Sequence, residues 1–300
     1  MMTTLSGITL TLDELIRARP PKSLGGFSPP GRVSTHQWGN NPSIFKGRGM
    51  EFAESRVYQV GDDVRNIDWR VTARTGETHT KLFQEERERP VQILVDLRRM
   101  MQFGTRRRFK SHLAGEIAAQ LAWVAYDGGD RMGGQILTPH GSAEFRPTRT
   151  RRGVLRFLAR IAAETALSGT DNPQTELTLA SATARLRRVC RPGTLVFIIS
   201  DFNDMDALLQ KELNRLSYHS HTTLIQINDA LDANLPVHGG RLSDGQHSVS
   251  LYALGQRVLT DYAMTFQQRQ KHLQQLCARY GITYHHLTTT DTASSLLQGH

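Results

Sequence analysis

Short apolar runs alternate with helical patterns along most of the chain. The run 91–95 is rich in Val and Ile and ends in Asp96, and the run 195–199 leads through Ser200 to Asp201. Unbroken apolar runs of this length are typical of strands buried on both faces of a parallel sheet. Their alternation with helices predicts an α/β fold with a doubly wound, mostly parallel sheet. Further strands are predicted at 130–137, 222–227 and 282–287, and helices with one apolar face at 106–126, 149–163, 175–188, 205–216 and 258–280.

Weaker signals predict smaller elements around this sheet. The run 143–147 is expected at a sheet edge, because Pro147 lacks the N–H group that an inner strand would donate. A short strand is expected at 251–254, and a closing helix capped by Asp291. Near the start of the chain, residues 11–14 form a capping-box pattern that predicts a short peripheral helix.

The segment 32–90 differs from the rest, with turn signals and charges of both signs. Alternation at 78–83 predicts a half-buried strand. We therefore expect three parts, which are a lead-in and linker at 1–31, a β-rich module at 32–90 and the α/β domain at 91–300. Charged residues surround Trp69 in the sequence, and we predict a partly buried ion-pair network that fixes geometry. Its members are Arg48, Glu51, Glu54, Arg56, Asp62, Asp63, Arg65, Asp68, Arg70, Arg74, Glu85 and Glu86.

The chain is basic, with a formal net charge of +9. Such a charge favours contact with nucleic acid, anionic lipid or an acidic protein, although scattered solvated faces would give the same total. Basic runs at 106–108, 149–152 and 185–188 are the candidate contacts. Few aromatic residues interleave these runs, so stacking on single strands is not indicated. Nucleic-acid binding is therefore kept as the alternative function.

The motifs of common enzyme classes are missing from the sequence. It contains no P-loop, no GxSxG and no HExxH pattern, and its 12 histidines are scattered. We therefore expect a non-catalytic protein. The 2 cysteines are far apart and form no CxxC, which fits a reducing compartment. No stretch approaches the roughly 20 apolar residues that cross a bilayer, and no signal-peptide pattern opens the chain, so a cytoplasmic location is expected.

The most distinctive residues fall in the 32–90 module and at three places beyond it. They are Gly47 to Phe52, Arg56 to Tyr58, Gly61 to Trp69, Thr72 to Arg74, Lys81 to Glu86, Asp96 to Gly104, Gly129 to Gly133, and Ser200 with Asp201. In this series the chain resembles the domain-of-unknown-function-58 family over nearly everything from Arg32 onward. The resemblance implies a von Willebrand factor A-like core and genomic pairing with MoxR-type AAA+ ATPases. Those systems are proposed to act in chaperone-like maturation or stress responses, so it implies an adaptor whose partner is such an ATPase or its client.

The resemblance also raises the question of a metal. Von Willebrand A domains can bind Mg²⁺ through an Asp-x-Ser-x-Ser motif at the first strand end, a loop Thr and an Asp at the fourth strand end. Here residues 96–100 read Asp-Leu-Arg-Arg-Met, so both serine positions are lost, and neither an arginine nor a thioether suits Mg²⁺. Asp201 remains, and Thr170 or Asp171 could come from the middle loop. We expect no metal at Asp96 and Asp201.

Arg98 suggests what replaces the metal. Its guanidinium could pair with Asp96 or Asp201 in a bidentate way and neutralise the carboxylates. Alternatively, Arg98 faces solvent and Asp96 only caps the following turn. In either case we predict an interaction surface at the carboxyl edge of the strands, derived from a degenerate metal site. It comprises Asp96, Arg98, Met100, Thr170, Asp171 and Asp201.

Overall fold

The computed structural model describes residues 6–21, 50–85, 90–166, 176–236, 240–243, 248–252 and 254–296. Internal contacts divide the chain into two compact units. Met1–Ser28 and Arg89–His300 form the first, which we call the sheet unit, and Pro29–Glu88 form the second, which we call the hairpin unit. None of the described helices is both long enough and apolar enough to cross a membrane.

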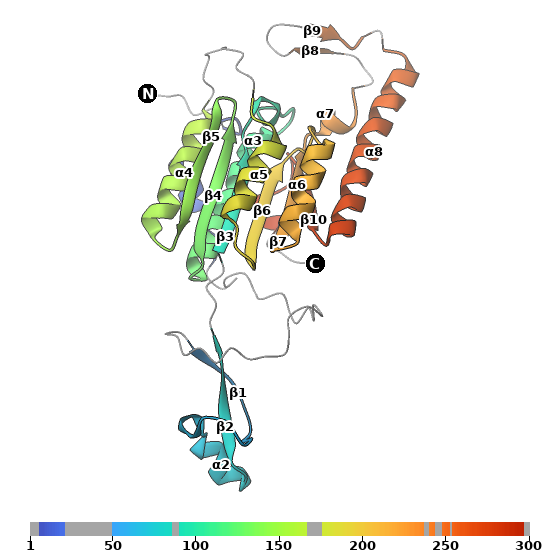
Figure 1. Ribbon diagram of the computed structural model, residues 1–300. Coiled ribbons are helices and arrows are strands. Elements are labelled where there is room, and N and C mark those ends of the chain that lie inside the picture. The colour runs from blue at the N-terminus through green and yellow to red at the C-terminus, as the bar shows by residue number, and fades with distance from the viewer. Residues whose placement is uncertain are drawn as a thin grey trace. The chain divides into compact units, whose positions relative to one another are not determined.

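Six strands form the central sheet of the sheet unit, in the order β10-β7-β6-β3-β4-β5 (Figure 1). Every neighbouring pair is parallel except β4 with β5. The order grows outward from β3 in both directions, which makes the sheet doubly wound. The predicted α/β fold with a mostly parallel, doubly wound sheet is thus confirmed. The strands are β3 (Pro90–Asp96), β4 (Arg131–Thr138), β5 (Gly141–Thr148), β6 (Thr194–Ser200), β7 (Ser220–Asn228) and β10 (Thr283–Thr288).

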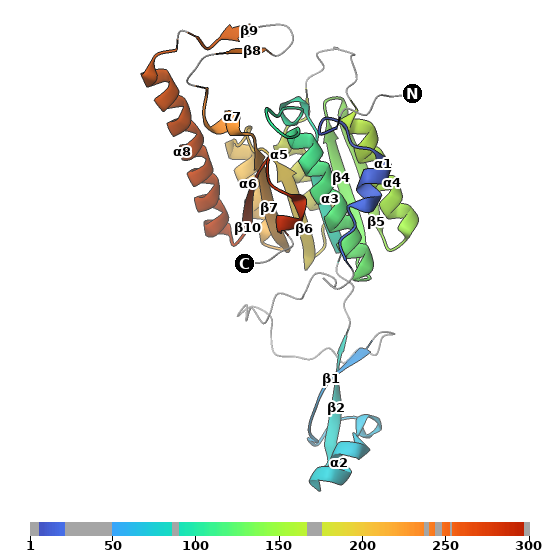
Figure 2. The same ribbon diagram turned by 180° about the vertical axis from the view of Figure 1, so that it is seen from behind.

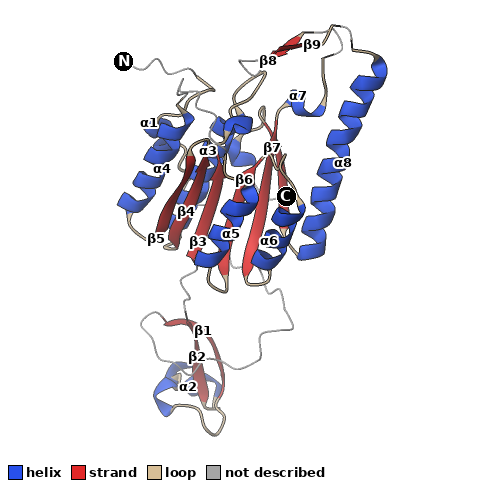
Figure 3. Ribbon diagram, turned by 45° about the horizontal axis from the view of Figure 1, so that its top comes forward, coloured by secondary structure: helices blue, strands red, loops and turns tan. Residues whose placement is uncertain are grey.

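Helices cover both faces of this sheet, as Figures 2 and 3 show. Two separate apolar clusters hold them, one on each face of the sheet. The inner strands contribute to both clusters, because successive side chains of a strand point to opposite faces. One face carries α1 (Leu12–Arg17), α3 (Lys110–Asp127) and α4 (Arg151–Thr165), and the other carries α5 (Leu179–Val189), α6 (Ala207–Ser217) and α8 (Gln256–Tyr280).

The sequence predicted a short peripheral helix near the start of the chain. The helix is present as α1, but it is part of the core. Thr11 caps it with a capping box, and Leu15 is fully buried. Gly115 of α3 leaves room for Leu10, because a Cβ there would lie 2.4 Å from a methyl carbon of that leucine. The indole N–H of Trp123 also donates to the carbonyl of Leu15 at 3.1 Å. The apolar residues before and inside α1 therefore close one end of the cluster between α3 and α4.

Two smaller predictions fail at the periphery, and one holds. β5 is the antiparallel edge strand expected from Pro147. No strand includes Leu251 or Tyr252, because the local strands pair just before them as a hairpin of β8 (Arg241–Ser243) and β9 (Ser248–Ser250). The closing helix is only the 3-10 turn η4 (Ala293–Leu296). The Asp291 carboxylate accepts from Thr288 and does not cap that turn.

The hairpin unit consists of an antiparallel pair of strands with two short helical elements. The predicted strand at 78–83 is present as part of β2, which pairs with β1. Asp68 caps the following helix through the N–H groups of Arg70 and Val71 and accepts a hydrogen bond from Ser55 at 3.0 Å. Gly76, with φ of 78°, ends this helix. The elements are β1 (Met50–Val57), η2 (Val64–Asn66), α2 (Trp69–Thr75) and β2 (His79–Glu85).

Candidate functional site

The candidate site lies where the sheet changes its direction of winding. β3 and β6 are neighbours, but the chain leaves them toward opposite sides of the sheet, and a crevice forms outside the carboxyl ends of such strands. Asp96 is the last residue of β3 and Asp201 directly follows β6. Both are buried, with exposed fractions of 1% and 4%. The two aspartates that the sequence singled out are therefore brought to the same edge.

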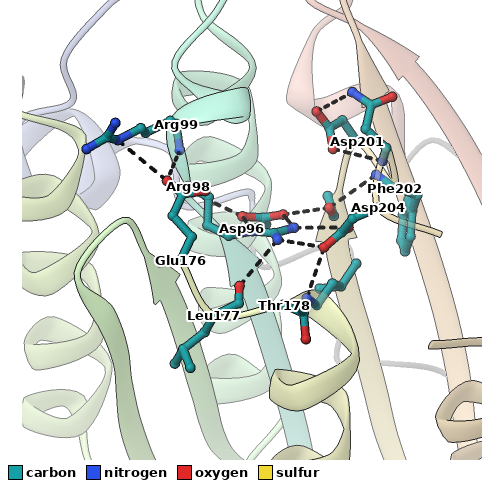
Figure 4. A network of polar contacts seen from close by, with 12 residues as sticks. Asp96, Arg98, Arg99, Glu176, Leu177, Thr178, Asp201, Phe202 and Asp204 are labelled. Atoms are coloured by element: carbon teal, nitrogen blue, oxygen red, sulfur yellow. Dashed lines mark hydrogen bonds and ion pairs between the residues drawn. The ribbon is translucent and has the colours of Figure 1, made fainter. Parts of the chain in front are cut away.

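Arg98 forms the bidentate pair with Asp96 that the sequence suggested (Figure 4). Its Nε donates to Oδ1 at 2.9 Å, and its Nη2 to Oδ2 at 2.7 Å. The backbone N–H of Arg98 also donates to Oδ1, and the Ser200 hydroxyl donates to Oδ2 at 2.7 Å. These four donors fill the acceptor positions of the carboxylate. Arg98 does not face solvent, because its side chain is only 11% exposed.

The other side of the guanidinium binds a second carboxylate, which the sequence reasoning missed. Arg98 Nη1 donates to Asp204 Oδ2 at 2.6 Å, and Nη2 to Oδ1 at 3.2 Å. Asp204 also accepts from the N–H of Leu179 at the start of α5. Arg98 thereby joins β3, the loop after β6 and α5.

Burial and pairing oppose each other in this group. Burial raises the pKa of the Asp96 carboxyl above its ordinary value, and the hydrogen bonds from Arg98 and Ser200 offset part of that rise. Burial lowers the pKa of the Arg98 guanidinium, but its hydrogen bonds to Asp96 and Asp204 outweigh this and leave the pKa raised. Burial also raises the pKa of Asp204, but the hydrogen bond and the charge of Arg98, together with backbone donors such as the Leu179 N–H, outweigh it, so that the net shift is downward. Arg98 is therefore cationic, and it is compensated from both sides.

Asp201 pairs with Lys110 rather than with Arg98, which corrects one of the two partners suggested from the sequence. The ammonium of Lys110 lies 2.8 Å from Asp201 Oδ2 and 3.3 Å from Asp232 Oδ2, and this lysine side chain is fully buried. Burial lowers the pKa of Lys110, but the two carboxylates outweigh it and the net shift is upward. Asn203 completes the shell of Asp201 through its backbone N–H at 3.1 Å and its amide at 2.8 Å.

These residues do not fit the Mg²⁺ site that the family resemblance implies. Mg²⁺ requires several oxygen ligands in a near-octahedral shell. The acceptor positions of Asp96 are filled by N–H and O–H donors, and Asp201 is bound to an ammonium. The space between the strand ends is thus occupied by two cationic side chains of the chain itself.

The remaining predicted surface residues are only partly placed. Met100, in η3 (Arg99–Met101), is 58% exposed and takes no part in the Asp96 network. Thr170 and Asp171 lie outside the described residues. A pocket of about 390 Å³ opens beside Asp201, and its lining is mixed, with polar residues that include Asn203, Arg269 and His272. Its apolar lining comprises Phe202, Met205, Phe266 and Leu273.

The ion-pair network expected around Trp69 can be followed only among the described residues. Arg56 pairs with Asp62 at 2.7 Å, and Asp68 is tied into the helix cap. Trp69, however, is 70% exposed, because α2 turns it away from the strands. Of the other predicted members, Asp63 caps η2, and Arg65, Arg70 and Arg74 are exposed. Arg48 and Glu86, and the side chains of Glu51, Glu54 and Glu85, lie outside the described part of the chain.

The basic runs are partly used inside the fold. Arg108 is buried and contacts Glu116 and the carbonyls of Thr289 and Asp291. Arg187 pairs with Glu212 at 2.9 Å. A share of the positive charge that suggested nucleic acid therefore stabilises the chain itself.

Asp229, another residue that the sequence reasoning missed, fastens three segments at the same edge. It accepts from the N–H and hydroxyl of Thr105, from the Thr289 hydroxyl at 2.6 Å and from the Leu231 N–H at 3.0 Å. Burial raises the pKa of this carboxyl, but the hydrogen bonds from Thr105 and Thr289 outweigh it and leave the pKa lowered. The sequence did hold a signal for Asp229, because this carboxylate closely follows the predicted strand at 222–227, in the same way that Asp96 and Asp201 follow theirs.

Replacing Asp229 with Asn should lower the free energy of unfolding by about 2 kcal/mol at neutral pH, because an amide N–H₂ would face existing donors. Since the folded pKa lies below the unfolded one, the contribution is complete above the ordinary carboxyl pKa of about 3.9 and is lost as the pH falls through the folded pKa. Urea unfolding at about pH 7 and at stepwise lower pH should show the difference between the wild type and Asp229→Asn shrinking. A difference that stays constant down to about pH 3 would contradict this account.

Comparison with known proteins gives a family but no activity. The family model described as "Protein of unknown function DUF58" matches residues 54–271. Uncharacterized proteins of Mycobacterium bovis and Mycobacterium tuberculosis are 34% identical over 203 residues, covering 66% of this chain and 61% of theirs. The chain thus spans less than two thirds of the length of these relatives.

Two solved structures superpose loosely on the chain. One is the crystal structure of the conserved hypothetical protein BatB from Bacteroides thetaiotaomicron, with a TM-score of 0.44 and 12% identity over 70% of this chain and 94% of that one. The other is the SpRpn10 VWA domain, with a TM-score of 0.36 and 14% identity over 71% and 94% of the two chains. Because both superpositions are loose, we draw no conclusion about function from them and rely on the geometry of the site.

Proposed function

This chain belongs to the DUF58 family, and from that premise and the geometry of the sheet edge we propose that it is a non-catalytic interaction protein. The observation that carries the proposal is the double neutralisation of the strand-end aspartates. Arg98 compensates Asp96, and Lys110 compensates Asp201. Carboxylates bound in this way are not free to serve as a general base or as metal ligands. The two pairs instead hold the end of β3, the loop after β6 and the start of α3 in fixed positions at the sheet edge.

Exposed apolar side chains support contact at this edge. Met100, four residues after Asp96, is 58% exposed, and Leu208, in the first turn of α6, is 65% exposed. Both lie where the chain leaves β3 or β6, so both belong to the carboxyl side of the sheet. Exposed apolar side chains held in place by buried ion pairs suit the apolar core of a protein interface. The pocket beside Asp201 offers further apolar surface there.

We assign the partner by family resemblance. A MoxR-type AAA+ ATPase or its client is the proposed partner, and chaperone-like maturation or stress response in the cytoplasm is the proposed process. In this role the protein is an adaptor that presents the sheet edge to the ATPase or to the client.

The test uses two purified proteins, which are this chain and the MoxR-type ATPase encoded in the same genome. Their affinity is measured by biolayer interferometry with and without ATP. Replacing Met100 and Leu208 with glutamate should weaken binding by at least about tenfold, since charge in the core of an interface is costly. The matched control also introduces glutamate, at Val189 and Tyr218, which are 54% and 75% exposed at the opposite end of the sheet.

The control pair should leave the affinity unchanged. Equal weakening by both pairs would remove the sheet edge from the interface, and no binding by the wild type would overturn the choice of partner. Circular dichroism of all variants shows whether the fold is intact, and none of the four replaced side chains is buried.

A further inference from the structure

The hairpin unit carries an exposed surface that its own fold does not use. In α2, Val71 and Thr72 are half-buried, whereas Trp69, Arg70 and Arg74 are exposed. The hydroxyl of Thr72 accepts from the N–H of His79 at 2.9 Å, so the inward side of α2 is fastened to β2. Val64 and Arg65 are exposed as well, in the turn η2, which ends at Asn66, three residues before α2 begins. We call the exposed residues Val64, Arg65, Trp69, Arg70 and Arg74 the Trp69 surface.

This surface has the composition of a binding site. Trp69 is 70% exposed and Val64 is 62% exposed, whereas tryptophan is highly buried in most proteins. Arg70 and Arg74 are four residues apart and so lie on the same side of the helix. Tryptophan and arginine are enriched among the residues that dominate binding energy at interfaces. Within the described part of the chain, the side chains of Arg65, Arg70 and Arg74 have no ion-pair partner.

We propose that the Trp69 surface binds a short acidic segment of a protein partner. Carboxylates of the segment pair with the three guanidiniums, for which bidentate contacts are the favoured geometry. An apolar side chain of the segment covers the Trp69 ring and excludes water around those pairs. This surface belongs to the hairpin unit, so the inference goes beyond the docking proposed for the sheet edge.

The charge of the unit favours an acidic peptide over nucleic acid. Residues 29–88, the whole unit, include nine carboxylates against nine lysines and arginines, so the unit has no net positive charge. A long polyphosphate would find no excess of positive charge on this unit once it left the Trp69 surface. A short segment needs only the local cluster of cations. The fit is therefore to a peptide a few residues long that carries both carboxylates and an apolar anchor.

The test uses the full chain and a fluorescein-labelled peptide of glutamates around a central leucine, with binding followed by fluorescence anisotropy. The wild type should bind the peptide, and added salt should weaken the binding. Trp69→Ala should reduce the affinity about tenfold, and so should the pair Arg70→Ala with Arg74→Ala. Trp69→Phe should retain part of the affinity, because it keeps an aromatic ring.

The matched control is the pair Arg151→Ala with Arg152→Ala, two exposed arginines at the start of α4. It removes the same charge and should leave peptide binding unchanged, and so should the sheet-edge pair Met100→Glu with Leu208→Glu. Absence of binding by the wild type, or equal weakening by the Arg151 and Arg152 control, would overturn the inference. It would also be overturned if a labelled single-stranded oligonucleotide bound more tightly than the peptide and lost that binding in the Trp69 and Arg70 variants.

Discussion

Replacing Arg98 with alanine should lower the free energy of unfolding by about 3–5 kcal/mol, the usual cost of removing one partner of a buried ion pair. The change leaves Asp96, which is 1% exposed, without the two guanidinium donors and with only the Ser200 hydroxyl among its side-chain donors, and it also leaves Asp204 without the guanidinium. Urea unfolding followed by circular dichroism measures the difference. Arg98→Lys should lie between the wild type and the alanine variant, because an ammonium keeps the charge but cannot donate in a bidentate way.

The neighbouring Arg99 supplies the matched control. Its side chain is 46% exposed and lies 3.8 Å from Glu176, so its contact is the weaker, solvent-screened kind. Arg99→Ala should therefore cost less than about 1 kcal/mol. If Arg98→Ala costs no more than Arg99→Ala, Arg98 does not compensate Asp96 in solution.

The contact between Arg98 and Asp96 was predictable because it is local in the chain. Arg98 is two positions after Asp96, which is the last residue of a strand whose pattern predicts its burial. A strand buried on both faces delivers its last residue to the sheet edge, where an arginine two positions later can turn back to it. The sequence thus offered this pair as one of its alternatives, beside a pair with Asp201 and an Arg98 that faces solvent, and the structure selects among them.

The other half depends on contacts that sequence spacing does not encode. Lys110 lies 91 positions before Asp201. The two residues meet only because α3 packs against the sheet with its first turn beside the carboxyl ends of the strands. A signal did exist, because Lys110 shares a helical face with Leu113 and Ile117, both fully buried. A lysine on such a face needs a buried counter-charge. Asp204 gave no comparable signal, since it sits in a loop whose turn is set by the left-handed backbone of Phe202, with φ of 55°.

The burial expected around Trp69 does not include Trp69 itself, which is 70% exposed. Mixed charges near aromatic residues suggested burial, but α2 has only seven residues and no buried side chain. A helix this short is held by its Asp68 cap and by two half-buried residues, Val71 and Thr72, so most of its residues face outward. Counting charges could not show which side Trp69 takes, whereas the Asp68 cap and the contact of Thr72 with β2 decide it.

Replacing Lys110 with methionine should lower the free energy of unfolding by about 3–5 kcal/mol. Methionine can fill the apolar part of the space, but it leaves Asp201 buried with only the donors of Asn203. Asp232, at 19% exposure, keeps access to water and should contribute little to the loss. The measurement is urea unfolding beside Lys211→Met, which removes an exposed lysine of α6 and should change stability by less than about 0.5 kcal/mol.

A second change separates lost charge compensation from lost packing. Asp201→Asn in the Lys110→Met background removes the uncompensated charge and keeps a side chain of the same shape. The double variant should therefore recover more than half of the stability that Lys110→Met loses, because well-packed neutral replacements of buried ion pairs are often close to neutral. If the double variant is less stable than Lys110→Met alone, the loss comes from packing around the lysine stem, and the pair with Asp201 is not what holds α3 to the strand ends.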